Sequence, residues 1–117
     1  MNFEEPMQRL LDDCPGAQGA AIVGPDGIPV VVTPREGSLE TLGVELAAIL
    51  RDLAKAAREF QHGRLEQCSV FAEDAIIILT TINAGYFLIL VMSRDGLAGK
   101  ARFQSRVVGA RLYSEFI

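Results

Sequence analysis

An uncharged run of 18 residues, Ala75–Met92, constrains this chain more than any other feature of its sequence. A membrane-spanning helix needs roughly 20 predominantly apolar residues, but threonine, asparagine and glycine interrupt this run near its middle. Its halves, Ala75–Ile82 and Tyr86–Met92, have strand length and are rich in β-branched and aromatic residues. Asn83 and Gly85 can supply the positive-φ positions of a tight connection. We therefore interpret the run as a buried β-hairpin and expect no stable membrane insertion.

Strands that are apolar on both sides must be covered by helices on both faces of their sheet. Hydrophobic periodicity and turn residues locate the remaining elements. The expected elements are a helix over Phe3–Asp13, strands over Ala17–Gly24 and Ile28–Thr33, a helix from Ser38 to about Gln61, a strand over Arg64–Glu73, the hairpin strands, and a helix over Leu97–Phe116. Pro29 cannot donate a ladder hydrogen bond, which places its strand at a sheet edge. The sequence thus predicts one α+β domain over residues 1–117, an α-β-β-α-β-β-β-α sandwich with a five-stranded antiparallel sheet between helices.

Charge is distributed unevenly along the chain. Residues 1–93 carry 6 basic and 13 acidic side chains, whereas residues 94–117 carry 5 basic and 2 acidic ones. The formal net charge of −4 argues against a general nucleic-acid-binding protein. An acidic body with a basic tail fits either a charged partner surface or a solvated helix face.

No arrangement of residues typical of an active site emerges from the sequence. The segment Gly96–Ala101 resembles a phosphate-binding loop, but its glycines enclose two residues rather than four and no hydroxyl follows Lys100. Cys14 and Cys68 are far apart and lack metal-binding spacing, and His62 stands alone at an expected helix end. We therefore expect no catalytic residue, metal ligand or cofactor. Two widely separated cysteines and an acidic N-terminus without a signal core favour a reducing, cytoplasmic compartment.

The long helix presents several distinct faces. Its sheet-facing side is expected to comprise large apolar residues: Leu42, Leu46, Ile49, Leu53 and Phe60. Beside them runs a stripe of smaller apolar residues: Gly43, Ala47, Leu50 and Ala54. The flanks carry a basic ridge of Arg51, Lys55 and Arg58 and an acidic ridge of Glu45, Asp52 and Glu59. The stripe fits close approach by a second helix, and a chance arrangement of small residues fits it equally.

The third strand, Arg64–Ala72, is expected at the second open edge of the sheet. An unprotected edge invites pairing with another chain, and this edge together with the small-residue stripe fits a two-fold homodimer with a continuous sheet. The predicted dimer interface consists of Gly43, Ala47, Leu50, Ala54, Leu65, Gln67 and Ser69.

Four segments in this order resemble the roadblock family, relatives of the dynein light chain and of the bacterial gliding-motility GTPase activator. The segments are PGAQGAAIVGPDGIPVVV (Pro15–Val32), LETLGVELAAIL (Leu39–Leu50), HGRLEQCSVF (His62–Phe71) and RDGLAGKARF (Arg94–Phe103). The resemblance covers nearly the whole chain. It implies a profilin-like sandwich, obligate pairing and binding to a small Ras-like GTPase. Some members accelerate GTP hydrolysis, and others act as scaffolds or recruit partners.

Together these observations predict a non-catalytic homodimeric regulator or scaffold that binds a small Ras-like GTPase and could stimulate its GTP hydrolysis. The expected partner-binding residues are Arg51, Lys55 and Arg58, because exposed charges steer encounter and orient partners. The alternative is a sensor module that holds a small ligand between sheet and helix. A sensor needs polar groups that converge on an internal pocket, and the apolar strands offer few.

Overall fold

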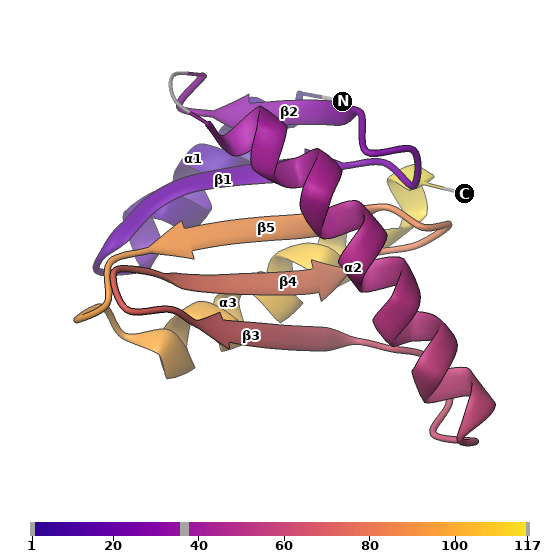
Figure 1. The fold of residues 1–117 in the computed structure, drawn as a ribbon. Coiled ribbons are helices and arrows are strands. Elements are labelled where there is room, and N and C mark those ends of the chain that lie inside the picture. The colour runs from indigo at the N-terminus through magenta and orange to yellow at the C-terminus, as the bar shows by residue number, and fades with distance from the viewer. Residues whose placement is uncertain (1, 36–37, 117) are drawn as a thin grey trace.

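The chain forms one five-stranded antiparallel sheet with helices on both faces (Figure 1). The computed structural model describes residues 2–35 and 38–116, so positions 1, 36, 37 and 117 of the expected domain lie outside the described residues. The elements are α1 (Glu4–Asp13), β1 (Ala17–Val23), β2 (Pro29–Thr33), α2 (Leu39–Glu59), β3 (Gln67–Phe71), β4 (Ile76–Thr81), β5 (Phe87–Met92), α3 (Ala98–Leu112) and the 3-10 turn η1 (Tyr113–Phe116). The predicted order of helices and strands is confirmed. The third strand is shorter than predicted, and the last helix ends in η1.

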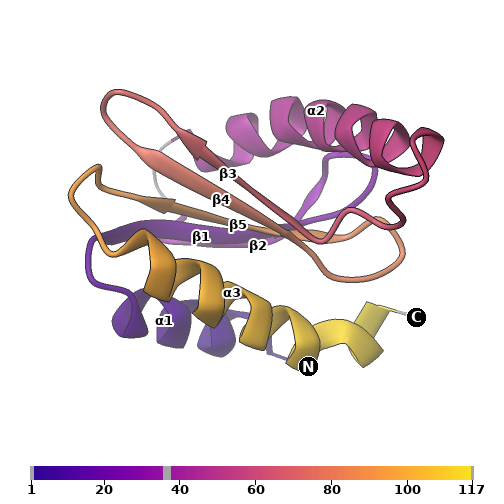
Figure 2. The same ribbon diagram turned by 90° about the horizontal axis from the view of Figure 1, so that it is seen from below.

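The sheet order is β2-β1-β5-β4-β3, which puts the expected hairpin in the interior and leaves β2 and β3 at the edges. Figure 2 shows α1 and α3 side by side on one face and α2 alone on the other. Strand β5 alternates between these layers, since Leu88 and Leu90 pack toward α1 and α3 whereas Phe87 and Ile89 pack toward α2. The uncharged run is therefore buried from both sides, as the sequence predicts.

The turn that joins β4 to β5 differs from the sequence expectation in one position. Ala84 and Gly85 adopt positive φ angles of 54° and 84°, while Asn83 does not. The Asn83 Nδ2 instead donates a hydrogen bond of 3.0 Å to the carbonyl oxygen of Phe116. This hydrogen bond links the turn to Phe116. Ala84, rather than Asn83, adopts the strained left-handed conformation.

We expect Ala84→Gly to stabilise the protein by about 0.5–1 kcal/mol, because a Cβ in the left-handed region costs roughly 1–2 kcal/mol that glycine avoids. The control is Ala110→Gly, an exposed site within α3, where glycine should cost about 1 kcal/mol. Guanidinium unfolding at fixed protein concentration measures both. Destabilisation of equal size at the two sites would contradict this account of the turn.

The side of α2 that faces the sheet agrees only in part with the sequence prediction, since Leu46 is buried as expected. The buried residues of this helix are Leu39, Gly43, Leu46, Ala47 and Leu50. Three residues expected in the core are exposed instead, namely Ile49 by 52%, Leu53 by 42% and Phe60 by 71%. A Cβ on Gly43 would lie 3.1 Å from Cγ2 of Val23 in β1. The small residues therefore allow α2 to approach its own sheet closely.

Candidate partner-binding surfaces on α2 and β3

A groove of about 670 Å³ runs between α2 and the connection from β4 to β5. Apolar residues make up one part of its lining: Ala47, Leu50, Ala54, Leu65, Ile82 and Phe87. Charged residues make up another: Arg51, Lys55, Arg58, Glu59 and Arg64. The groove thus combines an apolar lining with four cations and one carboxylate, a composition suited to an acidic partner with apolar side chains.

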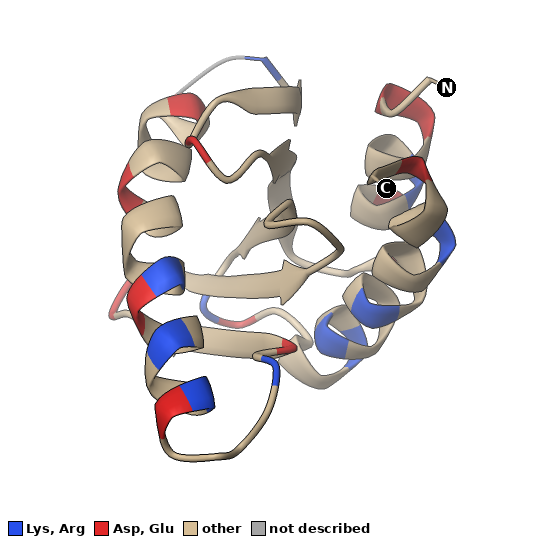
Figure 3. Cartoon of the chain, turned by 90° about the vertical axis from the view of Figure 1, so that its right-hand side faces the viewer, with Lys and Arg blue, Asp and Glu red and all other residues tan. Residues whose placement is uncertain are grey.

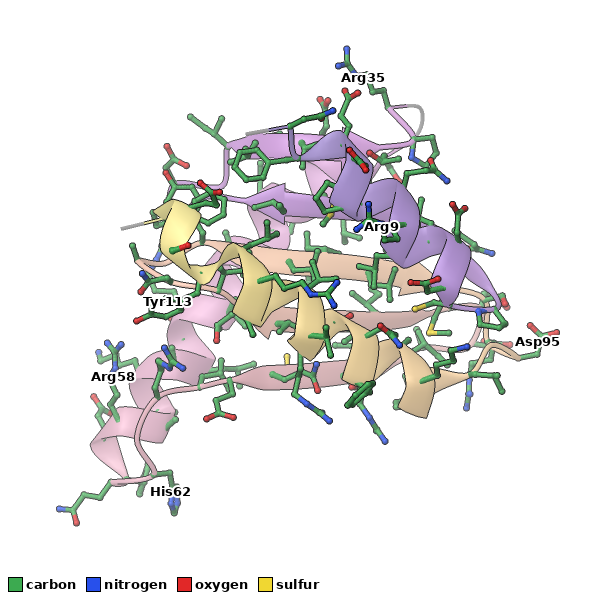
Figure 4. All side chains as sticks on the ribbon, turned by 180° about the vertical axis from the view of Figure 1, so that it is seen from behind. Arg9, Arg35, Arg58, His62, Asp95 and Tyr113 are labelled. Carbon is green, nitrogen blue, oxygen red and sulfur yellow. The ribbon has the colours of Figure 1, made fainter. Side chains whose placement is uncertain are left out.

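The three predicted partner-binding residues lie together along this groove. Figure 3 shows cations on successive turns in the second half of α2, interspersed with acidic residues. Arg51 Nη2 donates a hydrogen bond of 2.8 Å to the carbonyl oxygen of Pro25, which orients the guanidinium beside the turn between β1 and β2. Lys55 Nζ lies 3.9 Å from a carboxylate oxygen of Glu59 in a largely exposed pair, and such pairs contribute little stability. Arg58 projects from the end of the helix (Figure 4).

The other flank of α2 is apolar and uncovered. Leu42 is half-buried there, and Ile49, Leu53 and Phe60 are exposed. Because α2 crosses the sheet diagonally (Figure 1), this flank borders the uncovered part of β3. Cys68 of β3 packs toward α2, so Val70, two residues further along the strand and 41% exposed, points to the same side. We name these exposed residues, Ile49, Leu53, Phe60 and Val70, the α2–β3 apolar surface.

Strand β3 is paired only with β4, which confirms its predicted position at the sheet edge. The predicted interface residues on this strand are partly engaged within the chain. Gln67 Nε2 donates to Thr80 Oγ1 at 2.9 Å and to the carbonyl oxygen of Arg102 at 3.0 Å. Ser69 points to the same side as Gln67, and Leu65 packs against the α2-side core. A second chain could pair with the free backbone edge of β3 rather than with these side chains.

Burial within the chain disfavours a contact role for most of the predicted helix residues. Gly43, Ala47 and Leu50 are buried against the sheet of their own chain, and only Ala54 is half-exposed beside the groove. Sequence reasoning assigned the core to the larger apolar residues and the contact surface to the smaller ones. Leu46 is buried as expected, but Ile49, Leu53 and Phe60 are exposed. The α2–β3 apolar surface is therefore a better candidate for the contact than the buried small residues.

The histidine and the two cysteines, His62, Cys14 and Cys68, lie apart from one another. His62 is exposed beyond the end of α2 (Figure 4). Cys14 is buried, and burial raises the pKa of its thiol, with a smaller contribution from Asp13. Burial also raises the pKa of Cys68, so both environments disfavour the reactive thiolate.

Two classes of site are not found in the described part of the chain. Among residues 2–35 and 38–116, no three His, Cys, Asp or Glu side chains are grouped so as to hold a metal ion. No helix within these ranges combines the length and apolar character that crossing a membrane requires.

The Roadblock/LC7 domain model matches residues 4–93, more than half of the sequence. The chain therefore belongs to the Roadblock/LC7 family, as its sequence resemblance predicts. The match ends before α3 begins. No curated protein shows a significant match to the chain.

Solved structures share the fold of this chain. MglC from Myxococcus xanthus is 28% identical, with a TM-score of 0.70 over 98% of this chain and 99% of its own. The gliding protein MglB from Thermus thermophilus is 17% identical, with a TM-score of 0.83 over 95% of this chain and 85% of its own. A profilin from Schizosaccharomyces pombe is 14% identical, with a TM-score of 0.63 over 87% of this chain and 89% of its own. The predicted profilin-like fold is confirmed.

Proposed function

We propose that this protein is a non-catalytic homodimeric regulator or scaffold that binds a small Ras-like GTPase in the cytoplasm. Membership of the Roadblock/LC7 family carries the proposal, because the resemblance to gliding-motility GTPase activators implies such a partner. The 28% identity to MglC and the fold shared with MglB support it. Stimulation of GTP hydrolysis would come from ordering the GTPase's own residues, since no catalytic group is proposed in this chain.

The homodimer is proposed to form through the α2–β3 apolar surface and the free edge of β3. Ile49, Leu53 and Phe60 expose apolar side chains that a second α2 would cover. Pairing of two β3 edges would extend each five-stranded sheet into the other, with the same patch used by both chains. This interface keeps the predicted strand and helix but uses the uncovered flank of α2 instead of the buried small residues.

The GTPase is proposed to bind the groove beside Arg51, Lys55 and Arg58. An α-helix turns once in about 3.6 residues, so positions two apart lie on nearly opposite sides. Arg51 and Lys55 therefore face away from Leu53. The groove and the α2–β3 apolar surface are thus separate, which allows a homodimer to keep both grooves open to partners.

Reversing two charges at the groove should slow binding of the GTPase. We expect Arg51→Glu with Lys55→Glu to lower the association rate about tenfold at low ionic strength and to weaken its salt dependence, because charges at an interface rim act mainly on encounter. Surface plasmon resonance with purified small Ras-like GTPases, each loaded with GDP or a non-hydrolysable GTP analogue, measures both quantities. Exposed reversals should change stability by no more than about 0.5 kcal/mol.

The matched control is Arg102→Glu with Arg106→Glu, which makes the same change in net charge on α3. The control should bind at nearly the wild-type rate. If the control slows association while the groove variant does not, the partner binds the α3 side and the groove assignment is wrong.

A further inference from the structure

The two helices on the face opposite α2 carry opposite charge. Helix α1, EEPMQRLLDD, contains four carboxylates and one arginine. Helix α3, AGKARFQSRVVGARL, contains four cations and neither Asp nor Glu. The helices lie side by side (Figure 2), so one face of the molecule presents an acidic strip next to a basic strip.

Three charged side chains of α1 point away from the sheet. Met7 and Leu10 bury one side of α1, and helical spacing places Glu5, Arg9 and Asp12 on the other. Glu5 and Arg9 form an exposed ion pair of 2.8 Å, and Figure 4 shows Arg9 on this face.

Helix α3 presents a matching outer side. Ala101, Ser105 and Leu112 are buried, which directs Lys100, Phe103 and Arg111 outward by the same spacing. Phe103 is 54% exposed.

A uniformly anionic surface, such as a bilayer rich in acidic lipids, would attract α3 and repel the adjacent α1 at the same time. A second copy of the chain avoids this conflict. Rotation by two-fold symmetry about an axis parallel to the helices sets α1 of each copy against α3 of the other. Both strips then meet opposite charge, and the two Phe103 side chains can be covered near the contact.

We infer that the α1–α3 face is a self-association surface that pairs two copies of this chain through opposite charges. The surface lies across the sheet from α2 and does not depend on the proposed GTPase or on the proposed dimer. If that dimer forms, the α1–α3 contact joins dimers into tetramers. Exposed ion pairs each contribute little free energy, so the association is weak and sensitive to salt.

Charge-reversal variants test the inference. The acid-reversed variant carries Glu5→Lys and Asp12→Lys, and the base-reversed variant carries Lys100→Glu and Arg111→Glu. The reference is the wild-type mass measured by sedimentation velocity in about 1 M salt. At low ionic strength, the mass should rise with protein concentration toward twice that value. Each variant alone should stay at the high-salt mass, because the net outward-facing charges of α1 and α3 now share one sign. An equimolar mixture of the two should associate again, since both contacts regain opposite charges.

A third variant controls for net charge. Arg51→Glu with Lys55→Glu changes net charge as much as the base-reversed variant but leaves the α1–α3 face intact. Because that face is intact, this variant alone should associate as the wild type does. The inference is overturned if the wild type shows no salt-dependent increase in mass, if the charge-reversed pair fails to associate, or if the Arg51→Glu with Lys55→Glu variant stays at the high-salt mass. Binding of the wild type to anionic vesicles without any increase in mass would assign the face to a membrane instead.

Discussion

Replacing both Ile49 and Leu53 by glutamate is expected to convert the proposed homodimer into a folded monomer. These side chains are 52% and 42% exposed in the single chain, so a carboxylate at either position stays solvated there. In the proposed dimer the same carboxylates would be buried without partners, at a cost of about 3 kcal/mol or more. Since 1.4 kcal/mol corresponds to a factor of ten, the dissociation constant should rise at least about 100-fold. Light scattering after size-exclusion chromatography measures the mass.

The control for this result is Val44→Glu. Val44 is also exposed, by 54%, but it lies beside Gly27 in the turn between β1 and β2, away from the α2–β3 apolar surface. This variant should keep the wild-type mass. Dimers of unchanged affinity in the double variant would place the interface elsewhere, and loss of dimers in both variants would place it over the whole outer side of α2.

Ala47→Glu should unfold a large fraction of the protein or lower its stability by about 3 kcal/mol or more. Ala47 is 6% exposed and packs between α2 and the sheet, so the new charge is buried without a partner. Total stabilities of about 5–15 kcal/mol make such a loss severe. Denaturant unfolding followed by circular dichroism, at one protein concentration, gives the change in free energy.

The neighbouring substitution Ala48→Glu provides a matched comparison. Ala48 is exposed on the same helix, so its change in stability should remain within about 0.5 kcal/mol. Equal effects at the two positions would show that α2 is rotated relative to the orientation described above. If Ala47→Glu weakened the dimer without lowering the free energy of unfolding, the small-residue stripe would be part of the interface.

The sheet could be predicted from the sequence because its signals are local. The apolar runs on both sides of Asn83 require burial on two faces, which identifies them as interior strands of the sheet. Pro29 requires an edge position, which identifies one edge strand. Helix α2 was harder, because apolar residues occupy more than one of its sides. Which side packs depends on how closely the helix approaches β1, and that distance is set by the contact of Gly43 with Val23.

The candidate site was only partly accessible to sequence reasoning. Helical spacing places Arg51, Lys55 and Arg58 along one flank, and the structure agrees. The groove itself has no local signal, because Pro25 and the turn after β4 reach α2 only once the chain has folded. The stripe of small residues could not identify an interface for a related reason, since small residues serve close packing inside a chain as readily as between chains.

The most direct test of the proposed function is the mass of a complex with a GTPase. Wild-type protein mixed with each purified small Ras-like GTPase, in GDP-bound and GTP-analogue-bound forms, is passed over a size-exclusion column with light-scattering detection. We expect at least one GTPase to co-elute in one nucleotide state, at the mass of a homodimer of this chain plus one or two GTPase molecules. Separate elution of the folded protein from every GTPase in both states would contradict the proposal.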